Sequence, residues 1–321
     1  MKFQPRDYYK PFTFPWAYDL YKKSEAMHWL PEEVPLSNDV RDWNEKLSGG
    51  ERALLTDLFR FFTQADIDVA DGYHRHFIPA FKGIPELQMM MGSFANREAV
   101  HIDAYSKLIE TLGMPESTYK DFLSYKEMKA KHDYVNKFSS GSSHSLLLSL
   151  AAYSAFTEGL QLFGSFVILL NFSRLNKLKN MGNIIAWSIK DENLHVDGMT
   201  RLFREFAFHV YQQEGHPGLM KDLLPIAFKM VELEEHFIDL LFKGNSIEGL
   251  DPKDVKKYIH HLANQRWHQL GFNTDIYTVI GNPLPWVDFM VYGDEHANFF
   301  EQKSTAYSKG LTKGTIEEID W

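Results

Sequence analysis

Apolar residues recur at three- and four-residue spacing along most of this chain, which is the periodicity of amphipathic α-helices. The capping box Ser48-Gly-Gly-Glu51 opens one such stretch, and Pro85 stands at the start of the next, where a first-turn proline is tolerated. The pattern predicts long helices over residues 48–69, 85–113, 146–170 and 184–211, and further helices over residues 219–242 and 251–270. Alternating strand patterns do not interrupt these stretches, so we expect an all-α fold.

The chain shows no internal repeat and no low-complexity linker that would divide it. Residues 1–35 are rich in proline and aromatic side chains and read as an irregular N-terminal arm, and the C-terminal end also lacks a helical pattern. We expect one helical domain over residues 1–297 and a flexible tail over residues 298–321.

The stretch Leu146–Leu170 is long enough to cross a bilayer, since its 25 residues contain one charge. That charge, Glu158, lies near the middle, where a carboxylate opposes insertion by roughly 2.5–3.5 kcal/mol. No second stretch of this kind occurs in the sequence. We therefore expect the central helix of a large bundle rather than a membrane span, and Glu158 then needs a partner inside the protein.

Composition excludes several classes of function. The formal charge of −9 and the pI near 5.9 disfavour binding to nucleic acid or to an anionic membrane. The sequence contains no cysteine, which excludes disulfides, thiolate nucleophiles and sulfur-ligated metals. Any metal must bind through His, Asp and Glu. The residues after Met1 do not form a secretory signal, so a cytoplasmic location is expected.

The candidate chemistry begins with the motif Glu-x-x-His, because residues three apart on a helix share one face. It occurs as Glu25–His28, Glu98–His101 and Glu192–His195. Chance gives about one copy in a chain of this composition, so context must sort the three. Glu25–His28 lies in the N-terminal arm, where two solvated side chains are expected. The other two pairs lie inside predicted long helices.

A two-metal carboxylate site in a four-helix bundle needs Glu-x-x-His on two helices and one carboxylate on each of the other two. Glu158 supplies one of these carboxylates. Asp66, Asp68 and Asp71 are candidates for the other, and Asp66 continues the apolar face of its helix best, with Asp68 as the alternative. Oxygen and imidazole ligands without sulfur suit iron or manganese, and open coordination positions suit O₂.

These residues resemble the class I ribonucleotide reductase small subunits, a family of ferritin-like di-metal proteins, over roughly residues 25–245. The resemblance implies the metal ligands Asp66, Glu98, His101, Glu158, Glu192 and His195. Three further residues match the family: Tyr105 stands where it keeps a radical tyrosine, Asp191 precedes a ligand, and Trp29 lies in a segment that feeds electrons to the metals.

What the resemblance implies goes further than the residues alone. It implies a ferritin-like bundle with additional helices, two metal ions, Fe/Fe in the first place with Mn/Fe as an alternative, and O₂ for activation. The stored tyrosyl radical would pass to a separate large subunit, onto which the tail docks, with Tyr307 as the relay in that tail. A homodimer is also implied. Family members often have an apolar residue at the position of Ser188, which lies near the expected wall of the radical pocket.

Other functions remain open at this point. A ferritin-like di-metal oxidase could use the same site on a bound organic substrate, and an iron-storage or structural helical protein would need neither Trp29 nor an aromatic-ended tail. A further acidic cluster with histidine does not have the Glu-x-x-His spacing and is expected to form a solvated charged face; it comprises Glu232, Glu234, Glu235 and His236.

Overall fold

The computed structural model describes residues 3–212 and 216–292 of the chain. Within these ranges all the regular elements are helices, which confirms the expected all-α fold. In chain order the longer ones are α1 (Pro15–Ala26), α2 (Asp39–Glu45), α3 (Gly49–Gly72), α5 (Pro85–Thr111), α7 (Lys126–Val135), α8 (Ser143–Leu150), α9 (Leu162–Arg174), α10 (Lys179–Tyr211), α11 (Pro217–Phe242), α12 (Pro252–Gln269) and α13 (Pro285–Tyr292).

Short helical elements connect the longer ones. They are the 3₁₀ turns η1 (Pro31–Glu33), η2 (Leu36–Asn38) and η4 (Phe122–Ser124), the π-helical segments η3 (Tyr73–Phe77) and η5 (Ala151–Gln161), and the short α-helices α4 (Ile78–Ala80) and α6 (Ser117–Lys120). The six helices expected from the sequence are present, with ends that differ by a few residues. The 3₁₀ turns, η3, α4 and α6 were not predicted, because their patterns are too brief to show a period, whereas η5 lies inside the helix predicted over residues 146–170.

Local signals account for where the long helices begin. Ser48 and Glu51 form the expected capping box, in which the Glu51 N–H donates to Ser48 Oγ at 3.1 Å and the Ser48 N–H donates to Glu51 Oε2 at 2.8 Å. Pro85 stands at the first position of α5, as predicted. These interactions satisfy N–H groups that have no partner inside the helix.

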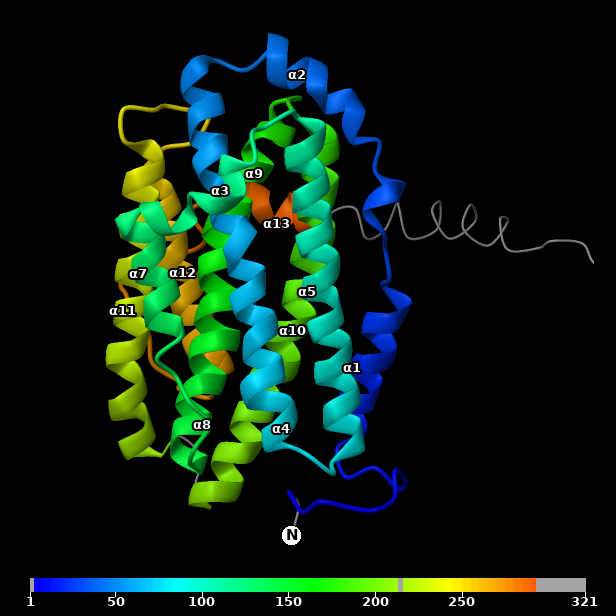
Figure 1. The fold of residues 1–321 in the computed structure, drawn as a ribbon. Coiled ribbons are helices and arrows are strands. Elements are labelled where there is room, and N and C mark those ends of the chain that lie inside the picture. Colours follow the sequence, from blue (N-terminus) through cyan, green and yellow to red (C-terminus); the bar gives the residue numbers. More distant parts are fainter. Residues whose placement is uncertain (1–2, 213–215, 293–321) are drawn as a thin grey trace, which may run out of the picture. The chain divides into compact units, whose positions relative to one another are not determined.

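The helix formed by α8, η5 and α9 lies at the centre of residues 1–283. It packs against α10, α11 and α12 and also contacts α3 and α7, and the long helices run side by side in Figure 1. The stretch Ser143–Arg174 is apolar enough to span a membrane, but its most apolar window is completely buried in the protein. This burial matches the core helix that the sequence predicts, and Glu158 lies on it.

The central helix is not a regular α-helix over its middle third, where η5 has π-helical hydrogen bonding across Glu158. Two side chains, one from this segment and one from α12, donate to its main-chain oxygens. Thr157 Oγ1 donates to the carbonyl of Ala152 at 3.1 Å, and Arg266 Nε donates to the carbonyl of Gly159 at 2.7 Å. Segments of this kind are frequent at functional sites, where they move a side chain out of the ordinary register.

The N-terminal arm is more regular than the sequence predicts, because it contains α1. This helix packs on α5 and buries Ala17 and Ser24. The residues just before it are held by the buried carboxylate of Glu86, which accepts hydrogen bonds from the N–H groups of Thr13 at 2.7 Å and Phe14 at 2.9 Å. The expectation of an irregular arm was wrong for this part, since proline at the first turn starts a helix rather than preventing one.

Residues Met1–Pro283 form one compact unit, and a second unit begins at Leu284. The described part of the second unit contains α13. The predicted tail of residues 298–321, with Tyr307, lies outside the described residues, and the domain boundary after residue 297 stays a prediction.

Candidate metal centre

Four helices bring the six predicted ligands into one buried cluster. Asp66 comes from α3, Glu98 and His101 from α5, Glu158 from η5, and Glu192 and His195 from α10. Each of these residues is at most 1% exposed. The Glu-x-x-His spacing places both members of each pair on the inner face of its helix, as expected from helical geometry.

The cluster consists of two groups that share Glu98. In one group, ligand atoms of Glu98, Glu158, Glu192 and His195 lie within 4.8 Å of one another. In the other, ligand atoms of Asp66, Glu98 and His101 lie equally close together. The buried Glu/His cluster therefore fits a di-metal site.

Each histidine directs Nδ1 towards the carboxylates. His195 Nδ1 lies 3.1 Å from Glu98 Oε1, 3.3 Å from Glu192 Oε2 and 3.6 Å from Glu158 Oε1. His101 Nδ1 lies 3.3 Å from Glu192 Oε1 and 3.6 Å from Glu98 Oε2. Both imidazoles thus offer a nitrogen lone pair to the space that the carboxylates enclose when the rings are neutral.

Several oxygen and nitrogen atoms of the cluster that could bind a metal are buried without a hydrogen-bond partner. They are Asp66 Oδ2, both carboxylate oxygens of Glu98 and of Glu192, and both ring nitrogens of His195. Buried polar groups of native proteins are otherwise almost always hydrogen-bonded. Four carboxylates that converge in the core carry four negative charges when ionised, which two divalent cations would neutralise. The residues present therefore fit a pair of metal ions.

Electrostatics inside the cluster lead to the same conclusion. Burial raises the pKa of Asp66 well above its usual range, and the neighbouring charge of Glu98 raises it further. Burial likewise raises the pKa of Glu158 to about 8, although His195 opposes the shift. Without cations some of these groups must hold protons, so binding of metal ions would release them.

Asp66 and Asp68, the alternatives on α3, occupy different environments. Asp66 lies in the cluster with Glu98 and His101. Asp68 Oδ2 lies 2.7 Å from His132 Nδ1, and its other oxygen accepts a hydrogen bond from Gln64 at 3.1 Å. Residues two apart on a helix face different directions, which accounts for the separation.

A hydrogen-bonded chain leads from the cluster to Trp29. His101 Nε2 lies 3.2 Å from Asp191 Oδ2, and the indole N–H of Trp29 donates to the same oxygen at 2.8 Å. Trp29 is 5% exposed, and its ring stacks on that of His101 at 6.0 Å between centroids. The three side chains come together from distant parts of the chain: His101 lies on α5, Asp191 on α10, and Trp29 in the segment between α1 and η1.

Tyr105 lies one helical turn after His101 and is buried. Its phenol donates to Ser188 Oγ at 3.1 Å, and its ring stacks on Phe62 at 4.5 Å between centroids. Burial raises the pKa of Tyr105, and the nearby charge of Asp66 adds to the shift. Ser188 therefore places a hydrogen-bond acceptor in the buried wall of the Tyr105 pocket.

Comparison with known proteins decides the family. The family model for the ribonucleotide reductase small chain matches residues 6–283. This chain belongs to that family. A protein of Invertebrate iridescent virus 6 named probable ribonucleoside-diphosphate reductase small subunit is 44% identical, with 98% of this chain and 97% of the relative covered. The family, the oxidoreductase class and the role of a ribonucleoside-diphosphate reductase small subunit are thereby confirmed.

Solved structures of small subunits share the fold. The ribonucleotide reductase R2 subunit of Clostridium botulinum superposes with a TM-score of 0.79 at 18% identity, covering 86% of this chain and 88% of that one. The dimanganese(II)-NrdF of Streptococcus sanguinis superposes with a TM-score of 0.73 at 21% identity, covering 88% of this chain and 100% of that one. The expected ferritin-like bundle is confirmed.

In this ribonucleotide reductase small chain, the sequence analysis missed Tyr73, which lies at the edge of the cluster. Its phenol donates to Glu158 Oε1 at 2.9 Å, and the side chain is 1% exposed. A signal for it existed in the sequence, since Tyr73 follows Asp66 by two helical turns and so continues the same face of α3.

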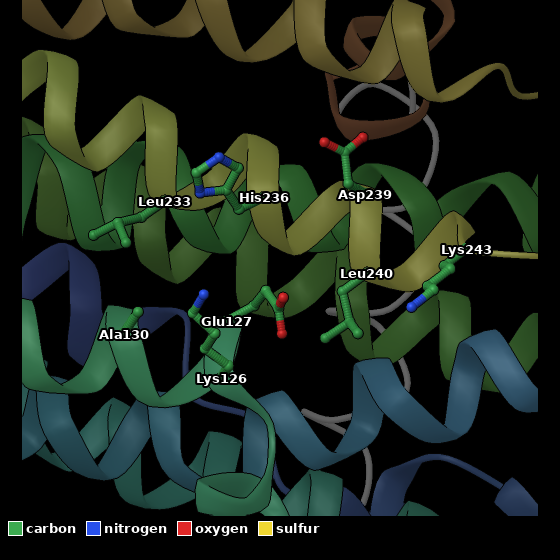
Figure 2. Close-up of a pocket in the computed structure, with 8 residues that line it drawn as sticks. All are labelled: Lys126, Glu127, Ala130, Leu233, His236, Asp239, Leu240 and Lys243. Carbon is green, nitrogen blue, oxygen red and sulfur yellow. The ribbon is translucent and has the colours of Figure 1, made fainter.

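The acidic stretch on α11 of this small chain is only partly the solvated face that we expected. Glu232 and His236 are exposed, but Glu234 is completely buried and pairs with Lys131 Nζ at 2.5 Å. The expectation was wrong for Glu234 because α7, which supplies the lysine, was not predicted. A cleft of about 310 Å³ lies nearby, between α7 and α11 (Figure 2), and its lining includes His236 but no residue of the metal cluster.

Proposed function

We propose that this small chain binds two metal ions through Asp66, Glu98, His101, Glu158, Glu192 and His195 and uses them with O₂ to oxidise Tyr105 to a radical. The observation that carries the proposal is the convergence of buried ligand atoms that have no hydrogen-bond partner. When bound, the reduced metal pair supplies the electrons that activate O₂. The radical then serves nucleotide reduction in a separate large subunit.

The protein's own contribution is ligand geometry and exclusion of water. Glu98 offers ligand atoms to both groups of the cluster and is the side chain suited to contact both ions. Asp191 accepts from both Trp29 and His101, so it holds the His101 ring in one orientation with Nδ1 directed inward. We infer that this chain of hydrogen bonds is also the path for electron entry and radical transfer.

The donor set does not distinguish iron from manganese, since carboxylates and imidazoles without sulfur suit both. We propose Fe/Fe in the first place, as the resemblance implies, with Mn/Fe as the alternative that the same residues would accept. Metal analysis of protein loaded with Fe(II), and with Mn(II) and Fe(II) together, decides between them. A preparation in which manganese alone fills both positions and supports the radical would overturn the Fe/Fe assignment.

The site itself is tested with Glu158→Ala and Tyr105→Phe. Glu158→Ala removes a ligand, so it is expected to lose at least one metal ion. Tyr105→Phe is expected to keep both ions and lose the stable tyrosine signal in electron spin resonance. Two tightly bound ions in Glu158→Ala would refute the ligand set. Two ions without any tyrosyl radical in the unaltered protein would indicate the alternative, a di-metal oxidase acting on an organic substrate.

We also propose that residues 298–321 dock on the large subunit and that Tyr307 relays the radical. The support is the sequence of the tail, which ends with acidic residues and Trp321 and can order on contact. Deletion of the last ten residues should leave the metals and radical intact and weaken large-subunit binding. Tyr307→Phe should keep binding and stop turnover, because phenylalanine has no phenolic proton. A homodimer and a cytoplasmic location complete the proposal.

A further inference from the structure

A second tyrosine contacts the candidate metal centre more directly than Tyr105 does. The phenol of Tyr73 donates to Glu158 Oε1 at 2.9 Å, whereas the phenol of Tyr105 donates to the hydroxyl of Ser188 at 3.1 Å. Both tyrosines are at most 2% exposed. They lie beside different groups of the cluster. Tyr73 contacts Glu158, which belongs to the group with His195, and Tyr105 lies near Asp66, which belongs to the group with His101.

The two hydrogen bonds differ in what they allow. Oxidation of a phenol to a neutral radical removes one electron and one proton, so a base within hydrogen-bond reach favours the reaction. A carboxylate oxygen is such a base, and its several lone pairs leave one for the phenol even when the carboxylate binds a metal. A serine hydroxyl cannot keep the proton unless it passes its own proton on. The geometry therefore favours proton loss at Tyr73.

We propose that Tyr73 is a second oxidisable tyrosine of this site, on the side of Glu158. In the step, the O–H bond of Tyr73 breaks, the proton moves to Glu158 Oε1, and one electron leaves the phenol for an O₂-derived oxidant, which the bound metal pair would supply. The oxidant is reduced by one electron and Tyr73 becomes a neutral radical. This inference rests on the proposed function, which supplies the oxidant.

The surroundings of Tyr73 suit a radical that forms and is then reduced again. Its ring meets those of Phe77, Phe94 and His195 edge to face, at 5.9, 6.3 and 6.2 Å between centroids. These side chains are buried and keep water away from the phenol. The proton stays on the neighbouring carboxylate, so return of an electron restores the phenol directly. We expect a short-lived radical at Tyr73, in contrast to a stable one at Tyr105.

The test uses the full chain loaded with metal, exposed to O₂ and frozen rapidly. Tyr105→Phe, which lacks the stable radical, is expected to show a transient tyrosine signal in electron spin resonance. The signal should narrow when the protein contains ring-deuterated tyrosine, and Tyr73→Phe in the same background should reduce it to baseline. Tyr258→Phe is the matched control, because Tyr258 is a buried tyrosine on α12 and should leave the signal unchanged. Metal content is measured in every variant.

Two results would overturn the inference. If Tyr105→Phe binds two ions but shows no transient tyrosine signal while the unaltered protein forms its radical, Tyr73 is not oxidised and only this inference fails. A transient signal that persists in Tyr105→Phe/Tyr73→Phe would also assign it to another residue. If the unaltered protein forms no radical at all, the proposed function fails, and the role of Tyr73 fails with it.

Discussion

Replacement of Lys131 by methionine should destabilise the protein strongly, because it leaves the carboxylate of Glu234 alone in the core. The Lys131 Nζ atom lies 2.5 Å from Glu234 Oε2, and the two side chains are 3% and 0% exposed. The same nitrogen lies 3.8 Å from the ring centroid of Phe61 and 4.4 Å from that of Phe237. The cation therefore interacts with one carboxylate and two aromatic faces, away from water.

The magnitude follows from burial. Removal of one partner from a buried ion pair costs about 3–5 kcal/mol, because the other charge stays behind without compensation. Burial raises the pKa of Glu234 and lowers the pKa of Lys131, so both charged forms are less favourable in the folded protein than in water. Replacement of both residues by methionine should therefore cost much less than the two single changes together, and can be close to neutral.

Denaturant unfolding of the two single variants and the double variant measures this coupling. Lys129→Met is the matched control: Lys129 is on the same helix, but its side chain is 51% exposed and its partner Asp133 49%, so a change within about 0.5 kcal/mol is expected. The reasoning would be refuted if Lys131→Met cost less than about 1 kcal/mol, or if the costs of the single variants were simply additive in the double variant.

Three further predictions follow from single contacts. Asp66→Ala should lower the metal content of the loaded protein and Asp68→Ala should not, and equal metal loss in both would contradict the assignment of the cluster. Ser188→Ala removes the acceptor of the Tyr105 phenol, so the g-values of the proposed Tyr105 radical should shift while the metal content stays constant; unchanged g-values would mean that the hydrogen bond is absent from the radical state. Although burial opposes the shift, hydrogen bonding to Lys177 lowers the pKa of Glu51 below its ordinary 4.5. The ionised carboxylate therefore stabilises the folded protein above that pH, and this stabilisation is lost as the pH falls through the lowered pKa. Glu51→Gln should accordingly reduce the free energy of unfolding at neutral pH but not in acid, and an equal loss at both would refute the pH argument.

The long helices and the two inner Glu-x-x-His pairs were predictable because their signals are local. A helix repeats every 3.6 residues, so spacing alone places Glu98 with His101 and Glu192 with His195 on one face each. The buried helix around Glu158 was equally clear, since an unbroken apolar stretch has to be covered by other parts of a folded protein. Fold class and the composition of the candidate site thus follow from short-range patterns.

The choice between neighbouring acidic residues needed tertiary contacts. Asp66 and Asp68 are two positions apart, and only the packing of α3 against α5 and α7 shows that one faces the cluster and the other faces His132. Glu234 likewise looked like part of a solvated face until Lys131, 103 positions away, was found beside it. A charge pattern along one helix cannot report a partner on another.

Helical periodicity and burial of apolar surface act over short stretches of chain, and for this reason the amino-acid pattern alone predicts an all-α bundle with carboxylates and histidines on four helices. The packing of the helices sets which groups meet, namely Tyr73 with Glu158 and Tyr105 with Ser188. It also sets the π-helical form of the segment that carries Glu158. The physical reason is that hydrogen bonds are sensitive to tenths of an ångström, and such distances are set by the packing of whole helices rather than by the residues of any one of them.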